Sequence, residues 1–200
     1  MIWAGAFGYA NLNIGKLADT GTIYRIASIT KTFTATLLML LVEDKIVSLD
    51  DLAEKYVPEV VNIIGYGNDT KFTLRQLASN TSGLRRWSEM SDANFGPVNG
   101  WVQKTLSSFS SLRFESKPGQ QWLYSDVGFC ILGLALERAS GKPYMEMIKY
   151  RILNPLHMNN TFFAPDSISI PHIAQGLYNA DGVVNKRIPK SQLQGLGYGV

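Results

Sequence analysis

The chain has few of the residues on which metal sites and histidine-based catalytic triads depend. It contains one cysteine and two histidines in 200 residues, so it forms no internal disulfide, and these three residues lack zinc-ligand spacing. His157 lies in a turn-like segment and His172 follows a proline, and we interpret both as structural or solvated. Cys130 lies in an apolar stretch that is typical of a core thiol. The sequence therefore predicts no metal site.

Signatures of several common activities are also absent. The chain has no Gly-x-Ser-x-Gly nucleophile motif and no Gly-x-x-x-x-Gly-Lys-Ser/Thr phosphate-binding loop. The glycines at positions 195, 197 and 199 precede no predicted helix, so they form no dinucleotide-binding loop, and we expect no cofactor. The net charge is +3, and the charges are dispersed without the basic stripe that nucleic-acid binding requires.

Long apolar runs are missing as well. The longest, about residues 35–42, is far shorter than the roughly 20 residues with which a helix crosses a bilayer. The N-terminus has no basic region followed by an apolar one, so no signal peptide is predicted, and the sequence assigns no compartment. The length and the 46% hydrophobic content suffice for a sizeable core, and we assign residues 1–200 to a single domain.

A Ser-x-x-Lys pair, Ser28 and Lys31, stands at the start of a predicted apolar helix. Residues three apart share one face of the first helical turn, so the amine lies beside the hydroxyl and can take its proton. The positive end of the helix dipole also favours an alkoxide there. Tyr124 opens a second motif with Ser125 and Asp126, and a tyrosine that reached this pair would complete a Ser-Lys-Tyr nucleophilic site. The spacing leaves open whether the lysine or the tyrosine is the base.

Local signals predict the elements around these motifs, and their order suggests an α+β fold. A short strand over residues 22–27 leads into the helix after Ser28, which we expect to be buried on most faces. A capping box at residues 73–76 begins a helix that ends before Gly83. Further helices are expected over residues 101–109 and 143–153, and over a short segment that Asp50 or Asp51 caps and Pro58 closes. A helix over residues 127–140 is expected to have Ser125 or Asp126 as its N-cap and to end at Gly141.

Six segments together resemble the class C β-lactamase and penicillin-binding-protein-like serine hydrolases. They follow the family's order over about residues 2–165, namely residues 7–10, 24–35, 44–51, 73–84, 118–129 and 154–162. This combination is far more specific than Ser-x-x-Lys, which chance alone supplies about once in such a chain. The resemblance implies an α+β fold of the β-lactamase/DD-peptidase type, in which helices cover an antiparallel sheet and the active site lies between the sheet and a helical region.

The resemblance also implies roles for individual residues. Ser28 would be the acylated nucleophile, Lys31 would help to deprotonate it, and Tyr124 would pass the proton to the leaving group. The backbone N–H of Ser28 would supply half of the oxyanion hole. A buried lysine without a carboxylate partner suits the base role. The implied partner is a small-molecule ester, amide, peptide or β-lactam substrate.

Asp126 departs from the family's pattern, because an asparagine usually stands at its position. A carboxylate cannot donate a hydrogen bond to a substrate carbonyl. If it points into the site, it would hold Lys31 protonated and repel substrates that carry a carboxylate, so Asp126 is a candidate substrate-binding residue. The alternative is that Asp126 simply caps the helix that follows it, and the two roles are compatible.

The family's third motif, a Lys-Thr-Gly or His-x-Gly sequence on a later strand, has no counterpart here. Residues 195–200 resemble the segment just before it, and residues 175–194 look shortened. The resemblance thus implies a fold that is incomplete at both ends, without its N-terminal helix, its last three strands and its closing helix. Two functions stay open. The chain is a serine hydrolase that forms an acyl-enzyme, or it is a catalytically incomplete fragment or non-catalytic binding relative.

Overall fold

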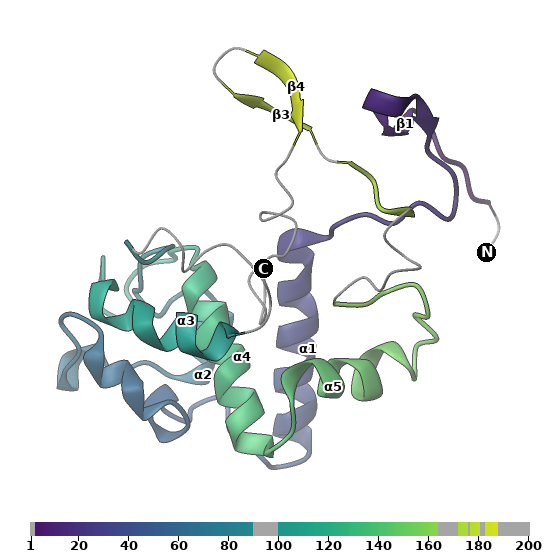
Figure 1. The fold of residues 1–200 in the computed structure, drawn as a ribbon. Coiled ribbons are helices and arrows are strands. Elements are labelled where there is room, and N and C mark those ends of the chain that lie inside the picture. Colours follow the sequence, from purple (N-terminus) through teal and green to yellow (C-terminus); the bar gives the residue numbers. More distant parts are fainter. Residues whose placement is uncertain (1–2, 90–99, 164–171, 176, 181–182, 188–200) are drawn as a thin grey trace.

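The computed structural model describes residues 3–89, 100–163, 172–175, 177–180 and 183–187. The α-helices gather in one body, and two small strand pairs lie at its edge (Figure 1). The helices are α1 (Thr30–Glu43), α2 (Leu74–Ala78), α3 (Trp101–Ser108), α4 (Asp126–Ser140) and α5 (Tyr144–Ile148), which continues into a π-helical turn, Lys149–Leu153. Short 3-10 helices lie at Leu12–Ile14, Ala27–Ile29, Ala53–Lys55, Pro58–Asn62, Asn68–Thr70 and Phe109–Ser111.

The strands in the described residues are short and form two antiparallel pairs. β1 (Tyr9–Asn11) pairs with β2 (Lys16–Leu17), and β3 (Leu177–Ala180) pairs with β4 (Val183–Arg187).

The prediction of a strand over residues 22–27 is wrong. Only Ile23 makes a bridge there, with Ile173. The Ile23 N–H donates to the His172 carbonyl at 2.8 Å, and the Ala174 N–H donates to the Ile23 carbonyl at 2.8 Å. The neighbouring residues form no ladder, because residues 172–175 pair with this segment at that one point.

Helix α4 is the centre of the core. Its residues are buried without interruption from Asp126 to Leu136, and a helix that is apolar on all sides needs neighbours on all sides. It packs against α1, α2, α3 and α5. The helix predicted over residues 127–140 is confirmed and begins one residue earlier, at Asp126, since the Ser125 side chain caps the N-terminus and Gly141, with φ +67°, caps the C-terminus.

Helix α1 buries one face rather than most of its surface. The buried residues are Lys31, Thr34, Leu37, Leu38 and Leu41, which recur at the three- and four-residue spacing of a single helical stripe. Met39, on another face, is 52% exposed. The buried stripe faces α4 and α5, and the Thr34 hydroxyl lies 2.7 Å from the buried Tyr144 hydroxyl. The expectation of burial on most faces is therefore too broad. Lys31 is the first residue of the buried face, at the N-terminal end of α1.

The capping box of α2 is confirmed, whereas the cap expected from Asp50 or Asp51 is wrong. The Thr73 hydroxyl accepts from the Gln76 N–H, and the Gln76 side chain accepts from the Thr73 N–H at 2.9 Å. The 3-10 helix Ala53–Lys55 has no side-chain cap. Asp51 instead accepts from the Tyr56 hydroxyl at 2.6 Å and from a preceding backbone N–H, so its oxygens are already engaged.

Gly83 allows the loop after α2 to lie directly against the segment that leads to α4. Its φ is +77°, and a Cβ built on it would lie 2.2 Å from the Ser116 carbonyl oxygen. Its own carbonyl accepts from the Glu115 N–H at 2.8 Å.

Among the described helices, none combines the length and the apolar character needed to span a membrane.

We expect Gly83→Ala to lower the free energy of unfolding by about 3 kcal/mol, because it adds a steric clash to the strain of a left-handed backbone. Gly141→Ala is the matched control, since Gly141 has φ +67° and open space around its Cβ position. That variant should lose only about 1 kcal/mol. Urea unfolding of both variants measures the difference, and equal losses would contradict the close approach at Ser116.

Candidate active site

Ser28 lies in the 3-10 turn Ala27–Ile29, immediately before α1. The preceding residue, Ala27, has φ +42°, which is rare for a residue with a Cβ. Such a conformation costs about 1–3 kcal/mol and persists only where the surrounding structure imposes it. The bend turns the chain into α1 and leaves the Ser28 side chain half-buried at the helix entrance.

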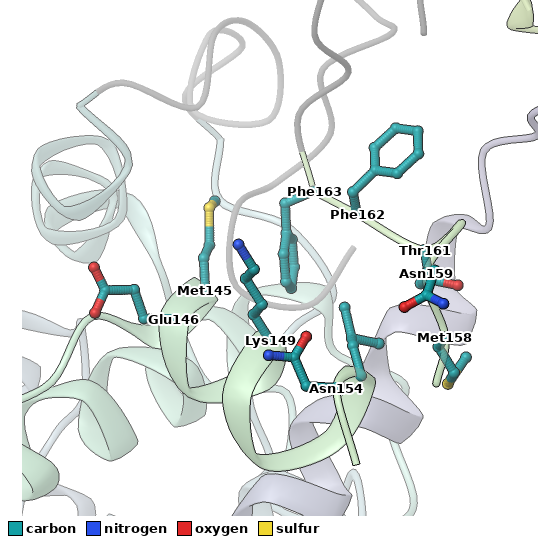
Figure 2. A pocket seen from close by; sticks show the side chains of 10 residues that line it. Met145, Glu146, Lys149, Asn154, Met158, Asn159, Thr161, Phe162 and Phe163 are labelled. Carbon is teal, nitrogen blue, oxygen red and sulfur yellow. The ribbon is translucent and has the colours of Figure 1, made fainter. Parts of the chain in front are cut away.

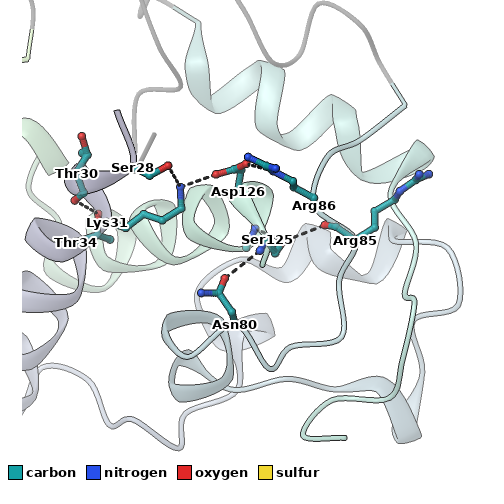
Figure 3. A network of polar contacts seen from close by, with 10 residues as sticks. Ser28, Thr30, Lys31, Thr34, Asn80, Arg85, Arg86, Ser125 and Asp126 are labelled. Atoms are coloured by element: carbon teal, nitrogen blue, oxygen red, sulfur yellow. Dashed lines mark hydrogen bonds and ion pairs between the residues drawn. The ribbon is translucent and has the colours of Figure 1, made fainter. Parts of the chain in front are cut away.

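The structure brings Lys31 to Ser28, as their spacing predicts. The Lys31 Nζ donates to the Ser28 Oγ at 3.2 Å (Figure 3). Lys31 belongs to the buried face of α1 and is only 6% exposed. A buried ammonium needs an anionic partner, because transfer of an unpaired charge out of water is strongly unfavourable.

Asp126 is that partner. It is fully buried, and its Oδ1 lies 2.5 Å from the Lys31 Nζ. Its Oδ2 accepts from the Arg86 Nε at 2.9 Å, so the carboxylate lies between two cations (Figure 3). The interpretation of Asp126 as the helix cap is wrong, because the Ser125 Oγ accepts from the Gly128 N–H at 3.0 Å and performs that role. Asp126 is the first residue of α4, where the helix dipole also favours a negative charge.

Tyr124 completes the group that the sequence singles out. The Lys31 Nζ lies 4.9 Å from the centroid of its ring, and the Arg86 Cζ lies 5.2 Å from it. Both cations are within the distance at which an aromatic ring attracts them. Ser28, Lys31, Tyr124 and Asp126 therefore meet around a single amine, although they come from the 3-10 turn before α1, from α1, from the segment before α4 and from α4.

Arg86 is the residue of this cluster that sequence reasoning missed. It lies in the loop after α2, and its side chain is 59% exposed while its Nε binds the buried Asp126. Two cations and one carboxylate leave a net charge of +1 in the cluster. The sequence predicts that Asp126 repels substrates bearing a carboxylate, but that expectation does not count Arg86. No periodicity or motif links positions 86 and 126, so only the folded loop reveals the pair.

Cys130 lies one turn after Asp126 on α4 and is 3% exposed. Burial raises the pKa of its thiol to about 12, so the thiolate is scarce at neutral pH. This environment agrees with a core thiol. Within the described ranges, no group of three histidine, cysteine, aspartate or glutamate side chains is arranged to hold a metal ion.

An open cavity of about 460 Å³ lies elsewhere, between α5, the π-helical turn and residues 158–163 (Figure 2). Met145, Lys149, Leu153 and Phe163 are among its lining residues. None of the cluster around Lys31 lines it, so the cavity is separate from the candidate site.

Known proteins resemble this chain over most of its length. A family model described as Beta-lactamase matches residues 1–196. The D-alanyl-D-alanine-carboxypeptidase/endopeptidase AmpH of Escherichia coli (strain K12) is 36% identical over 146 residues, which are 72% of this chain and 37% of that protein. Penicillin-binding protein 4* of Bacillus subtilis (strain 168) is 30% identical over 80% of this chain and 35% of its own length. The chain thus spans little more than a third of these relatives.

Solved structures share the fold. A β-lactamase/D-alanine carboxypeptidase from Yersinia pestis, complexed with citrate, matches with a TM-score of 0.76 and 29% identity over 96% of this chain and 54% of its own. The octameric penicillin-binding protein homologue from Pyrococcus abyssi matches with a TM-score of 0.73 and 29% identity, over 100% of this chain and 45% of its own. These matches confirm the expected α+β fold of the β-lactamase/DD-peptidase type.

We expect the Lys31–Asp126 ion pair to stabilise the fold more than the Arg86–Asp126 pair does. Asp126→Leu should lower the free energy of unfolding by about 3 kcal/mol, because it leaves a buried ammonium unpaired. Lys31→Met in the same chain should recover much of that loss, with a coupling energy of about 2 kcal/mol. The coupling between Arg86→Met and Asp126→Leu should stay below about 1 kcal/mol, because solvent screens the exposed guanidinium.

Chemical denaturation of the two double-mutant cycles measures both coupling energies. Equal couplings, or a larger one for Arg86, would contradict the assignment of Lys31 as the main partner of the buried carboxylate.

Proposed function

Because the chain belongs to the Beta-lactamase family, we propose that it carries the nucleophilic part of a serine hydrolase site, in which an ester, amide or β-lactam acylates Ser28. One observation carries this proposal. The Lys31 amine binds the Ser28 Oγ at 3.2 Å and Asp126 at 2.5 Å while it lies 4.9 Å from the centre of the Tyr124 ring. The proposed nucleophile, cation and proton-transfer group are thus adjacent.

The proposed reaction begins with attack of the Ser28 Oγ on the carbonyl carbon. Ser28 gives its proton to the Tyr124 oxygen as that hydroxyl gives its own proton to the leaving group, so the tyrosine ends unchanged. The bond to the leaving group breaks and an ester with Ser28 remains. A water molecule then attacks this ester, and the same relay returns a proton to Ser28.

Lys31 has a different role in this scheme from that of a free amine. As one half of an ion pair with Asp126, the amine carries its proton and donates to the Ser28 Oγ. An ammonium in that position stabilises negative charge that develops on the serine oxygen during attack. The ion pair therefore favours Tyr124 over Lys31 as the group that moves the proton.

For Asp126, the geometry favours an indirect role in substrate binding. Both of its oxygens accept from cations and the residue is fully buried. We propose that it orients Lys31 toward Ser28 and sets the charge that an approaching substrate meets. The backbone N–H of Ser28 is the proposed first donor to the oxyanion, as the family resemblance implies.

Intact-mass analysis after incubation with a fluorophosphonate, and separately with a penicillin, tests the nucleophile. We expect one adduct per chain, its loss in Ser28→Ala and its retention in Ser110→Ala, which removes an exposed hydroxyl elsewhere. Tyr124→Phe should slow acylation by about 10²–10⁴-fold, because it removes the proton relay but not the nucleophile.

Three results would count against this assignment. An adduct that persists in Ser28→Ala would move the nucleophile elsewhere, and an unchanged rate in Tyr124→Phe would remove the tyrosine from the relay. No adduct on a folded sample would favour the alternative, a catalytically incomplete or non-catalytic relative. The alternative draws on the finding that the chain spans 37% of AmpH.

The charge of the cluster yields a second expectation. Asp126→Asn keeps the side chain's shape and raises the net charge around Lys31 from +1 to +2. Acylation by an anionic penicillin should then accelerate about tenfold relative to phosphonylation by a neutral fluorophosphonate, and the gain should fade as salt screens it.

The matched control is Asp69→Asn, which makes the same change of net charge at an exposed position. Stopped-flow or mass-resolved acylation rates at low and high salt measure the ratio. An unchanged ratio in Asp126→Asn, or an equal rise in Asp69→Asn, would show that the charge of Asp126 does not act on the substrate.

A further inference from the structure

Asn80 holds the chain on both sides of Tyr124. It lies in the turn after α2 with φ +56°, a left-handed conformation that asparagine tolerates better than most residues. Its backbone carbonyl accepts from the Leu123 N–H at 2.7 Å. Its side-chain Oδ1 accepts from the Ser125 N–H at 3.0 Å (Figure 3). One residue thus fixes the two amides that flank the tyrosine.

We propose that Asn80 is a positioning residue for Tyr124 in the acylation reaction, an inference that rests on the proposed function. The backbone on either side of a residue determines where its Cα–Cβ bond points. The bonds to Leu123 and Ser125 therefore direct the Tyr124 ring toward the Lys31 amine. Because a small displacement of a reacting group slows catalysis steeply, loss of one of these bonds should reach the chemistry without touching the nucleophile.

Other contacts hold the same loop in place, so Asn80 can be altered with the rest of the loop still attached. The Gly119 N–H donates to the Thr81 carbonyl at 2.7 Å, and the Ser125 hydroxyl donates to the Arg85 carbonyl at 3.0 Å. The Asn80 side chain has one distinct task among these contacts. It satisfies the N–H of Ser125, a residue that is 1% exposed.

Two substitutions separate the side-chain bond from the backbone conformation. Asn80→Gly keeps the left-handed backbone and the carbonyl acceptor but removes Oδ1. Asn80→Asp keeps an oxygen at the same place and serves as the conservative rescue. Thr81→Val is the matched control in the same turn, because it removes a hydroxyl that lies 2.8 Å from the Ser79 hydroxyl and leaves the Asn80 bonds intact.

The experiment measures the rate constant of phosphonylation by a fluorophosphonate, with fluoride as the leaving group, and its concentration dependence on folded protein. Asn80→Gly should lower the limiting rate about tenfold while the half-saturating concentration changes less than about twofold. Asn80→Asp and Thr81→Val should stay within about threefold of the parent chain. In a Tyr124→Phe background, Asn80→Gly should have no further effect, since the group that it positions is gone.

A wild-type rate in Asn80→Gly would overturn the proposal. An equal loss in the Tyr124→Phe background would also overturn it, because a merely structural role lowers the rate in both backgrounds alike. The ring NMR signal of Tyr124 distinguishes this failure from failure of the proposed function. If the parent chain takes up no adduct, Asn80→Gly should still shift or broaden that signal while Thr81→Val leaves it unchanged. Without that difference, Asn80 does not position the tyrosine.

Discussion

The carboxylate of Asp126, buried between two cations, is the interaction on which the candidate site depends. It joins three parts of the chain, because Lys31 comes from α1, Asp126 from α4 and Arg86 from the loop after α2. Burial of a charge is unfavourable unless its partners meet it with good geometry, so these three segments must be packed correctly before the charge is tolerated. The candidate site can therefore assemble only when α1, α4 and the loop after α2 are correctly packed.

The same carboxylate also links the residues to which catalytic roles are proposed. It binds the Lys31 amine, which lies beside Ser28, and it accepts from the Nε of Arg86, whose guanidinium lies 5.2 Å from the centre of the Tyr124 ring. An asparagine at this position would leave two cations facing each other without a counterion. The carboxylate that replaces the family's usual asparagine is thus paired with Arg86 as well as with Lys31, and of the three side chains only that of Arg86 is largely exposed.

Sequence reasoning succeeded where the deciding interactions are local. The Ser28–Lys31 contact follows from helical spacing, and the ends of α4 follow from Ser125 and Gly141. It failed where two local signals compete or where tertiary contacts decide. Serine and aspartate are about equally good caps, and Ser125 has the extended backbone of an N-cap, with φ −128°. Arg86 and Asn80 lie in an irregular loop whose partners are some 40 residues away, and no pattern in the sequence encodes that distance.

Two residues next to the candidate site have a left-handed backbone although they are not glycines. Ala27, with φ +42°, directly precedes Ser28, and Asn80, with φ +56°, binds the amides around Tyr124. Neither residue is a glycine, so each conformation is unfavourable by itself and must be maintained by the packing around it. Glycine at either position would relax the strain and also release the constraint on the neighbouring side chain. If Ser28 and Tyr124 are the reacting groups, as proposed, their positions depend on neighbours that carry no reactive group, and a motif of reactive residues describes the site only in part.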